Sequence, residues 1–134
     1  MLADALVVAG PAGESARWVL QDEAELTVPA IFGAEVVSAV RSSLSRGAIS
    51  AGVANAAVQA VASLRTVTHP FEPFAVRTWE LRQNVTVYDA WYVALAEALD
   101  TELVTADRRL VAAVGPRCEV LDVRSFLDRR GGTR

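Results

Sequence analysis

Apolar and polar residues follow one another along the chain in blocks that predict helices separated by short strands. Apolar residues recur every three or four positions over residues 30–46 and again over residues 50–64, which is the spacing of a helix with one buried face. Gly47 lies between the two blocks, at a position where helix ends favour glycine. We therefore predict two helices that pack as a hairpin.

The second half of the chain continues this alternation. Residues 86–99 have the strongest helical pattern, and residues 102–105 follow directly as a short strand. Further helices are predicted at residues 15–20, 72–82 and 106–114, and further strands at residues 25–28, 66–68 and 118–123. Strands that alternate with helices form parallel βαβ units with helices on both faces of the sheet. We predict an α/β fold in a single domain, residues 1–128, followed by a polar tail over residues 129–134.

The start of the chain allows two positions for the first strand. The apolar residues 1–3 predict a very short strand that ends at Asp4. Residues 6–9 are an alternative strand, which would place Asp4 before the strand instead of after it. Asp4 could also be an exposed residue of a frayed terminus.

The composition excludes several kinds of chemistry. All 13 basic residues are arginine, so the chain cannot form a P-loop, a lysine Schiff base or a receiver-type phosphorylation site, because each depends on lysine. His69 and Cys118 are single residues of their kinds, too few for a zinc site or a disulfide within the chain. We expect His69 at the surface or in a cap, and Cys118, Trp79, Trp91 and Tyr92 in the core.

Hydropathy and charge indicate where the protein acts. No stretch reaches the roughly 20 apolar residues of a membrane span, and the chain begins without the basic segment of a signal peptide. We expect a cytoplasmic protein that makes no membrane contact. The net charge of −3 argues against a nucleic-acid partner unless bound cations offset it, because phosphate binding favours a basic surface.

Four acidic residues lie where the predicted fold gathers functional groups. In an open parallel sheet, ligands bind beyond the carboxyl ends of the strands. Asp4 and Asp107 follow predicted strands, and Glu35 and Asp89 lie near the starts of their helices. Converging carboxylates can hold Mg²⁺ or Mn²⁺, which activate water and stabilise the leaving oxygen in phosphodiester hydrolysis. We predict that the four acids meet in one pocket and bind such an ion.

The acids also have purely structural explanations when each is taken alone. Thr86 and Asp89 fit a capping box, in which a negative charge stabilises the start of the helix. Asp107 fits the start of its helix in the same way, and Thr105 could cap that helix. Glu35 could be a solvated helix residue. The joint arrangement of the acids is what favours a functional site.

The order of these residues resembles that of the PIN-domain ribonucleases, and in particular that of the VapC-type toxins of bacterial toxin–antitoxin pairs. The most specific stretches are YDAWYVALA at residues 88–96 and LVTADRRL at residues 103–110. The residues of this chain that match the family's motifs are Asp4, Glu35, Asp89, Thr105 and Asp107.

The resemblance implies a three-layer α/β/α fold around a parallel sheet of about five strands. It also implies an endoribonuclease that requires Mg²⁺ or Mn²⁺, forms a homodimer and is blocked by a cognate VapB-type antitoxin, whose binding groove would include residues 31–64. The four acids would coordinate the metal, with Thr105 as their polar support. If Asp107 binds metal, Arg108 and Arg109 beside it are well placed for RNA phosphate.

Two departures from the family pattern motivate an alternative function. The family commonly has Ser or Thr two residues after its first acid, where this chain has Leu6, and the strand predicted before Asp4 is only about three residues long. The alternative is a catalytically weak PIN-like protein that acts by binding RNA or an antitoxin.

Overall fold

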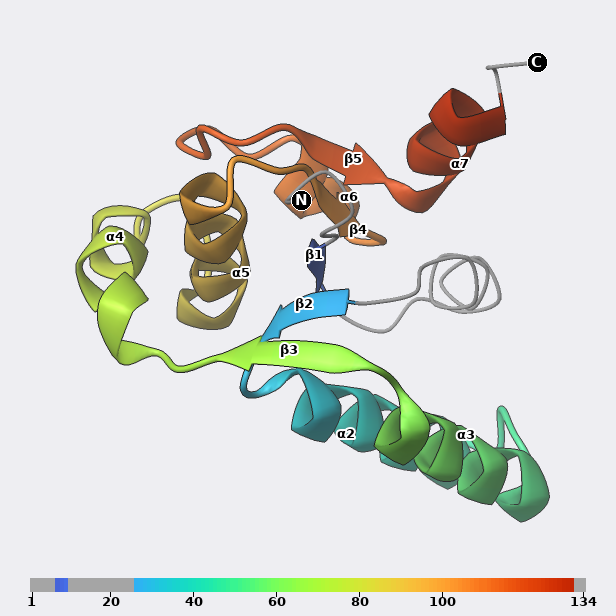
Figure 1. Cartoon of the computed structure of the whole chain (residues 1–134). Coiled ribbons are helices and arrows are strands. Elements are labelled where there is room, and N and C mark those ends of the chain that lie inside the picture. The colour runs from blue at the N-terminus through green and yellow to red at the C-terminus, as the bar shows by residue number, and fades with distance from the viewer. Residues whose placement is uncertain (1–6, 10–25, 132–134) are drawn as a thin grey trace.

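The computed structural model describes residues 7–9 and 26–131 of the chain, and its strands pair in parallel (Figure 1). Strand β4 (Leu103–Thr105) lies between β1 (Val7–Ala9) and β5 (Val120–Asp122), while β2 (Leu26–Pro29) pairs with β3 (Thr66–His69). Because β1 also contacts β2, the described strands lie side by side in the order β3, β2, β1, β4, β5. The predicted parallel α/β fold is confirmed.

The described strands form a three-stranded and a two-stranded sheet, whereas the sequence predicts one sheet of about five strands. Strand β1 has three residues. In a parallel sheet, each residue directs its N–H and C=O to the same neighbouring strand. A strand of three residues therefore has few backbone groups to divide between two neighbouring strands. The backbone groups of β1 pair with β4, where Val7 lies opposite Leu103 and Ala9 opposite Thr105.

The predicted helical hairpin is present. Helices α2 (Phe32–Ser45) and α3 (Ala51–Ser63) pack against each other and extend away from the strands (Figure 1). Gly47 in the connection has a φ of 72°, a left-handed conformation that glycine adopts without strain. Ser50 caps α3, because its hydroxyl oxygen accepts a hydrogen bond from the Val53 N–H at 3.2 Å.

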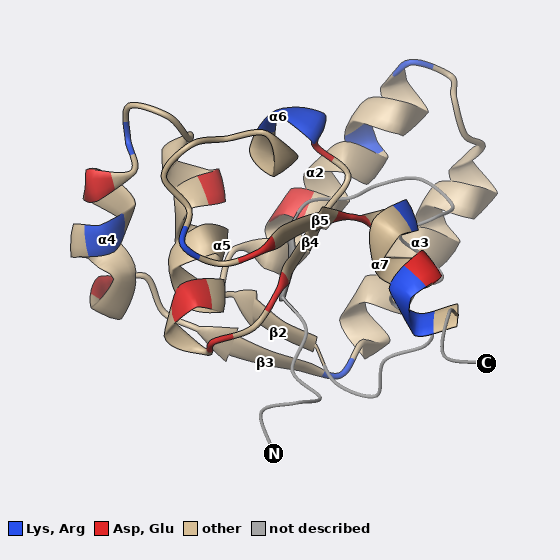
Figure 2. Cartoon of the chain, turned by 90° about the horizontal axis from the view of Figure 1, so that it is seen from above, with Lys and Arg blue, Asp and Glu red and all other residues tan. Residues whose placement is uncertain are grey.

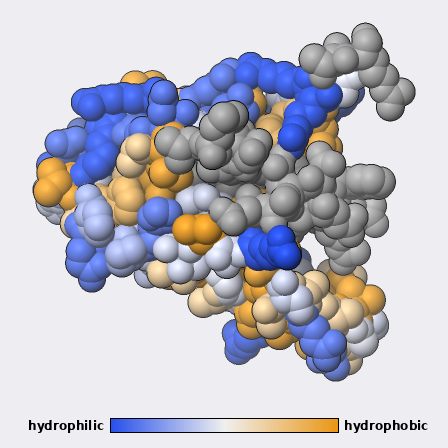
Figure 3. Space-filling model, viewed as in Figure 1, coloured by the Kyte–Doolittle hydropathy of each residue, from blue (hydrophilic) through white to orange (hydrophobic). Residues whose placement is uncertain are grey.

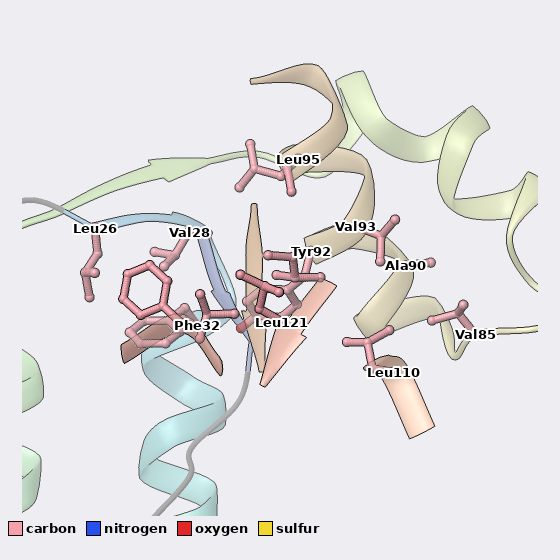
Figure 4. Packing of buried hydrophobic residues seen from close by; sticks show 14 of the residues in the cluster. Leu26, Val28, Phe32, Val85, Ala90, Tyr92, Val93, Leu95, Leu110 and Leu121 are labelled. Carbon is pink, nitrogen blue, oxygen red and sulfur yellow. The ribbon is translucent and has the colours of Figure 1, made fainter. Parts of the chain in front are cut away.

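Helix α5 (Val87–Ala98) forms the centre of the core and confirms the strongest helix prediction. The Thr86 hydroxyl oxygen accepts a hydrogen bond from the Asp89 N–H at 3.2 Å, so the predicted cap is present. All residues from Ala90 to Ala96 are buried, and the helix packs against β1, β2 and β4 (Figure 4). Since each large apolar side chain contributes about 1.5–3 kcal/mol on burial, α5 is held firmly in place.

Three other helical segments differ from the sequence prediction. The helix predicted over residues 72–82 is divided into the 3₁₀ turn η2 (Glu72–Phe74) and the helix α4 (Ala75–Glu80). Helix α6 (Arg108–Val111) is shorter than predicted. Helix α7 (Val123–Gly131), which the sequence did not predict, includes residues 129–131 of the expected polar tail.

Trp79 corrects one prediction about the core. Its side chain is 63% exposed, whereas Trp91 and Tyr92 are buried as predicted. Leu81, the C-cap of α4, is buried instead, and the guanidinium of Arg82 stacks 4.3 Å from the centre of the Trp79 ring. The helical pattern alone does not show which face of so short a helix meets the core.

Helices cover the strands on two sides. Helices α4 and α5 lie on one side, and α7 lies on the other with the α2–α3 hairpin (Figures 1 and 2). This arrangement is the predicted three-layer α/β/α fold. Within the described ranges, none of the helices combines the length and the apolar character that crossing a bilayer requires.

Candidate active site

The topology brings three of the predicted acids to one edge of the fold. Helix α2 follows β2, so Glu35 lies in the first helical turn after the carboxyl end of that strand. Helix α5 leads into β4 through a short connection and must run back along it, which returns Asp89, in its first turn, to the carboxyl end of β4. Asp107 lies two residues after Thr105, the last residue of β4.

Glu35 is tied to α5 by a hydrogen bond that the sequence did not predict. The Tyr92 hydroxyl donates to Glu35 Oε1 at 2.5 Å, and Tyr92 is only 1% exposed. Burial raises the pKa of Tyr92 above its ordinary value, and the hydrogen bond to Glu35 and the charges of Glu35 and Asp89 raise it further. Tyr92 therefore remains a hydrogen-bond donor, and Glu35 is not simply a solvated helix residue.

Asp89 and Asp107 interact electrostatically. Burial raises the pKa of Asp89, a hydrogen bond with the Thr86 side chain opposes this effect, and the negative charge of Asp107 raises the pKa again. Asp107 acts on Asp89 although the two residues belong to different elements. A carboxylate whose pKa is raised by a neighbouring carboxylate marks a place where a cation is favourable, because the cation removes their repulsion.

Thr105 and Asp107 form a small hydrogen-bonded unit at the start of α6. The buried Thr105 hydroxyl oxygen accepts a hydrogen bond from the Asp107 N–H at 3.0 Å. Asp107 Oδ1 in turn accepts one from the Arg109 N–H at 2.8 Å, so Asp107 is the N-cap of α6. Asp107 thus stabilises the helix start as the sequence allowed, but it is itself the cap, where the sequence offered Thr105. Its Oδ2 makes no hydrogen bond to another residue in the described ranges.

The donor atoms at this edge fit Mg²⁺ or Mn²⁺ in chemical type. They are carboxylate oxygens, the hard ligands that these ions prefer. Among the described residues, no three Asp, Glu, His or Cys side chains stand close enough to hold an ion by themselves. Mg²⁺ commonly takes only one or two protein carboxylates and completes its shell with water and substrate phosphate, so the Asp89–Asp107 pair is compatible with it.

Asp4 lies outside the described residues, as does the strand predicted at residues 1–3. The described first strand begins at Val7, which agrees with the alternative position at residues 6–9. Asp4 therefore precedes this strand in the sequence. Its membership of the site stays a prediction.

Two arginines lie near Asp122, the residue of β5 opposite Thr105. Basic segments of α6 and α7 are coloured blue in Figure 2. A hydrogen bond from the Ser125 N–H lowers the pKa of Asp122 most, and the charges of Arg124 and Arg108 lower it further. Arg108 and Arg124 thus come from different helices to the same place. The sequence indicated Arg108, which neighbours Asp107, but not Arg124. Arg124 comes near because β5, the strand before it, pairs with β4, and the sequence pattern does not show this pairing.

The single histidine and the single cysteine have other surroundings than the acids. The ring of His69 packs against that of Phe74, with the ring centres 6.3 Å apart. Cys118 is half-buried, and burial raises the pKa of its thiol to about 11, so it remains protonated near neutral pH. Cys118 lies before β5, at the amino end of that strand, whereas the acids lie at the carboxyl ends.

Comparisons with known proteins show what this chain is similar to. The PIN domain family matches residues 4–115, which include all four predicted acids. The chain is 42% identical over 122 residues to the ribonuclease VapC1 of Mycobacterium tuberculosis (strain H37Rv), covering 90% of this chain and 91% of that protein. It is 38% identical over 95 residues to the VapC ribonuclease Mb0985 of Mycobacterium bovis, covering 71% of this chain and 75% of that protein.

A solved structure shows the same fold. The crystal structure of PAE2754 from Pyrobaculum aerophilum matches with a TM-score of 0.73 and 23% sequence identity. The match covers 96% of this chain and 90% of that one. At this level of identity the similarity concerns the fold alone.

Proposed function

The chain belongs to the VapC ribonucleases of the PIN-domain family, and from this premise we propose that it is a metal-dependent endoribonuclease toxin that hydrolyses RNA phosphodiester bonds in the cytoplasm. The observation that carries the proposal is the electrostatic coupling of Asp89 to Asp107 at the edge where Glu35 is also held. Such a pair favours a bound cation. We also propose that the protein acts as a homodimer and is inhibited by a VapB-type antitoxin.

Each group at the edge has a role in this proposal. The four acids predicted from the sequence would hold Mg²⁺ or Mn²⁺, and Thr105 would keep Asp107 in place through the 3.0 Å hydrogen bond to its N–H. The bound ion supplies charge stabilisation for the phosphate oxygens and lowers the pKa of a bound water. Arg108 and Arg109 are exposed beside Asp107, and their guanidinium groups can bind RNA phosphate bidentately.

Removal of the metal tests the proposed reaction. We expect the EDTA-treated protein not to cleave a fluorescently labelled single-stranded RNA, because bare carboxylates repel phosphate, and we expect excess Mn²⁺ or Mg²⁺ to restore cleavage. Product formation is followed on denaturing gels, with circular dichroism as the check that EDTA leaves the fold intact. Cleavage that continues in EDTA at the untreated rate contradicts the metal dependence.

The alternative function is a catalytically weak protein that binds RNA or an antitoxin. It is supported by Leu6 at the position of a common polar residue and by a described first strand that follows Asp4. The same assay separates the two functions. If Mn²⁺ produces no cleavage while the protein still retains labelled RNA or antitoxin in a binding assay, the alternative is correct.

The α2–α3 hairpin offers a surface for the proposed antitoxin. It carries the exposed apolar residues Val37 and Leu44 on α2 and Val53 and Val58 on α3. Apolar surface is visible over this hairpin in Figure 3. Exposed apolar residues gathered on one element are typical of a protein interface.

Charged substitutions on α3 should weaken antitoxin binding. We expect Val53→Asp combined with Val58→Asp to raise the Kd for the antitoxin about tenfold or more, because both residues would bring a charge into an apolar contact. Cleavage by the free protein should not change. Val114→Asp is the matched control, since Val114 is also exposed but lies outside the hairpin. Equal antitoxin affinity of the double variant and the control, measured by calorimetry, contradicts this surface.

A further inference from the structure

Tyr92 joins the two helices that carry Glu35 and Asp89, and nothing in the proposed reaction yet uses it. We propose that Tyr92 is a positioning residue that holds the Glu35 carboxylate in the orientation required for metal binding. This inference rests on the proposed function. It assigns a role at the metal site to a side chain that sequence patterns place in the core.

The position of Tyr92 on α5 supports this role. Tyr92 and Asp89 are three residues apart on the helix, a spacing that places both on one face. Tyr92 also lies within the fully buried stretch from Ala90 to Ala96, so its ring is fixed by packing on every side. A hydrogen bond from such a ring holds its acceptor at a defined place relative to Asp89.

Glu35 needs such a support more than the other acids. Asp107 is short, and its Oδ1 is bound to the Arg109 N–H at 2.8 Å. Glu35 has a longer and more flexible side chain, and it lies on α2, the first helix of the hairpin that extends away from the strands. Ordering a glutamate side chain costs conformational entropy, and a hydrogen bond already made in the metal-free protein removes this cost from metal binding.

The hydrogen bond also leaves part of Glu35 available. Tyr92 occupies Oε1, and Oε2 makes no hydrogen bond to any other residue within the described ranges. One oxygen can therefore be held by the protein while the other faces a ligand. This division is the usual arrangement of metal-binding carboxylates, whose partners in the protein orient them.

A structural role for the hydroxyl makes different predictions. If the hydrogen bond only satisfies a buried hydroxyl, Tyr92→Phe lowers thermal stability and leaves the Kd for Mn²⁺ unchanged. If Tyr92 positions Glu35, the same substitution weakens Mn²⁺ binding. Metal affinity therefore separates the two roles, and it can be measured without RNA.

The experiment compares the Kd for Mn²⁺ of the metal-free full-length protein and its variants by isothermal titration calorimetry. We expect Tyr92→Phe to raise this Kd by about 10- to 100-fold, the effect of losing a partner that orients a metal ligand. Tyr88→Phe is the matched control for the same chemical change, because Tyr88 neighbours Asp89 but is exposed. We expect the control to bind Mn²⁺ as tightly as the wild type.

A double-mutant cycle tests whether Tyr92 acts through Glu35. Glu35→Ala should weaken Mn²⁺ binding, and adding Tyr92→Phe to it should have no further effect on the Kd. An equal loss from Tyr92→Phe in both backgrounds overturns the proposal. So does wild-type affinity in Tyr92→Phe alone, and in that case the proposed function stands. A wild-type protein that binds no Mn²⁺ overturns both together.

A measurement on the wild type keeps the inference testable if Tyr92→Phe does not fold. The buried hydroxyl proton of Tyr92, bonded to a carboxylate, should give a downfield proton NMR signal. We expect Mg²⁺ to shift this signal without removing it, because Glu35 keeps its bond to Tyr92 when it binds the ion. Loss of the signal at saturating Mg²⁺ means that Glu35 leaves Tyr92, and it overturns the proposal.

Discussion

Replacing Asp89 and Asp107 by asparagine is expected to remove RNA cleavage while leaving the fold intact. Each single substitution should lower kcat on the order of 10²–10³-fold, because it removes a charge that helps to hold the catalytic ion. The double variant should lose little more than either single one, since the two residues act as a unit. The measurement is the initial rate of RNA cleavage at saturating Mn²⁺.

Asparagine distinguishes the catalytic role of Asp107 from its role as a helix cap. An asparagine oxygen caps a helix about as well as an aspartate oxygen, so the Arg109 N–H keeps its acceptor. If Asp107 were only a cap, Asp107→Asn would cleave RNA normally. Asp128→Asn is the control, because Asp128 is an exposed acid on α7 and is not one of the four predicted acids. Full activity in the double variant contradicts the proposed site.

Replacing Glu97 by glutamine is expected to cause a large loss of stability, although Glu97 is remote from the chemistry. The Arg77 guanidinium donates to Glu97 through Nε at 2.7 Å and Nη2 at 3.0 Å, and the Arg117 N–H donates to it at 2.7 Å. Glu97 thus links α4, α5 and the segment before β5. We expect Glu97→Gln to lower the free energy of unfolding by about 2 kcal/mol, between the values of exposed and fully buried pairs.

Glu80 provides the control for Glu97. It accepts a hydrogen bond from the same Arg77 guanidinium at 3.1 Å, but its side chain is 52% exposed, against 13% for Glu97. We expect Glu80→Gln to cost less than about 0.5 kcal/mol, as most exposed ion pairs contribute little. Urea unfolding of both variants at pH 7 provides the comparison. Equal losses would contradict the role of burial in this network.

The stability difference between wild type and Glu97→Gln should depend on pH. Burial alone would raise the pKa of Glu97, but the hydrogen bonds from Arg77 and Arg117 hold it below its ordinary value of 4.5. A carboxylate with a lowered pKa in the folded state stabilises the fold fully above its unfolded pKa. The difference should therefore be complete above about pH 5 and shrink as the pH falls through the lowered pKa. A difference that stays constant down to pH 3 contradicts this origin.

Local patterns in the sequence predicted the elements that depend on neighbouring residues. Helix α5 begins where Thr86 can cap it, because a cap needs only residues three positions apart. The order of strands and helices was also sufficient to predict that Glu35, Asp89 and Asp107 approach one edge. Parallel strands place their carboxyl ends together, so the position of an acid after a strand already indicates its place in the fold.

The contacts that complete the site were decided by the tertiary structure. Tyr92 and Glu35 are 57 residues apart, and Arg77 and Glu97 are 20 residues apart, so no helical or strand period relates the partners. The division of the strands into two sheets and the exposure of Trp79 likewise depend on which neighbour each element meets. The sequence by itself determined the parallel α/β fold, the Thr86 cap and which acids are candidates for the site, because these follow from local periods and chain order. The packing of distant helices determined how those acids are held, because it brings together side chains that the chain order keeps apart.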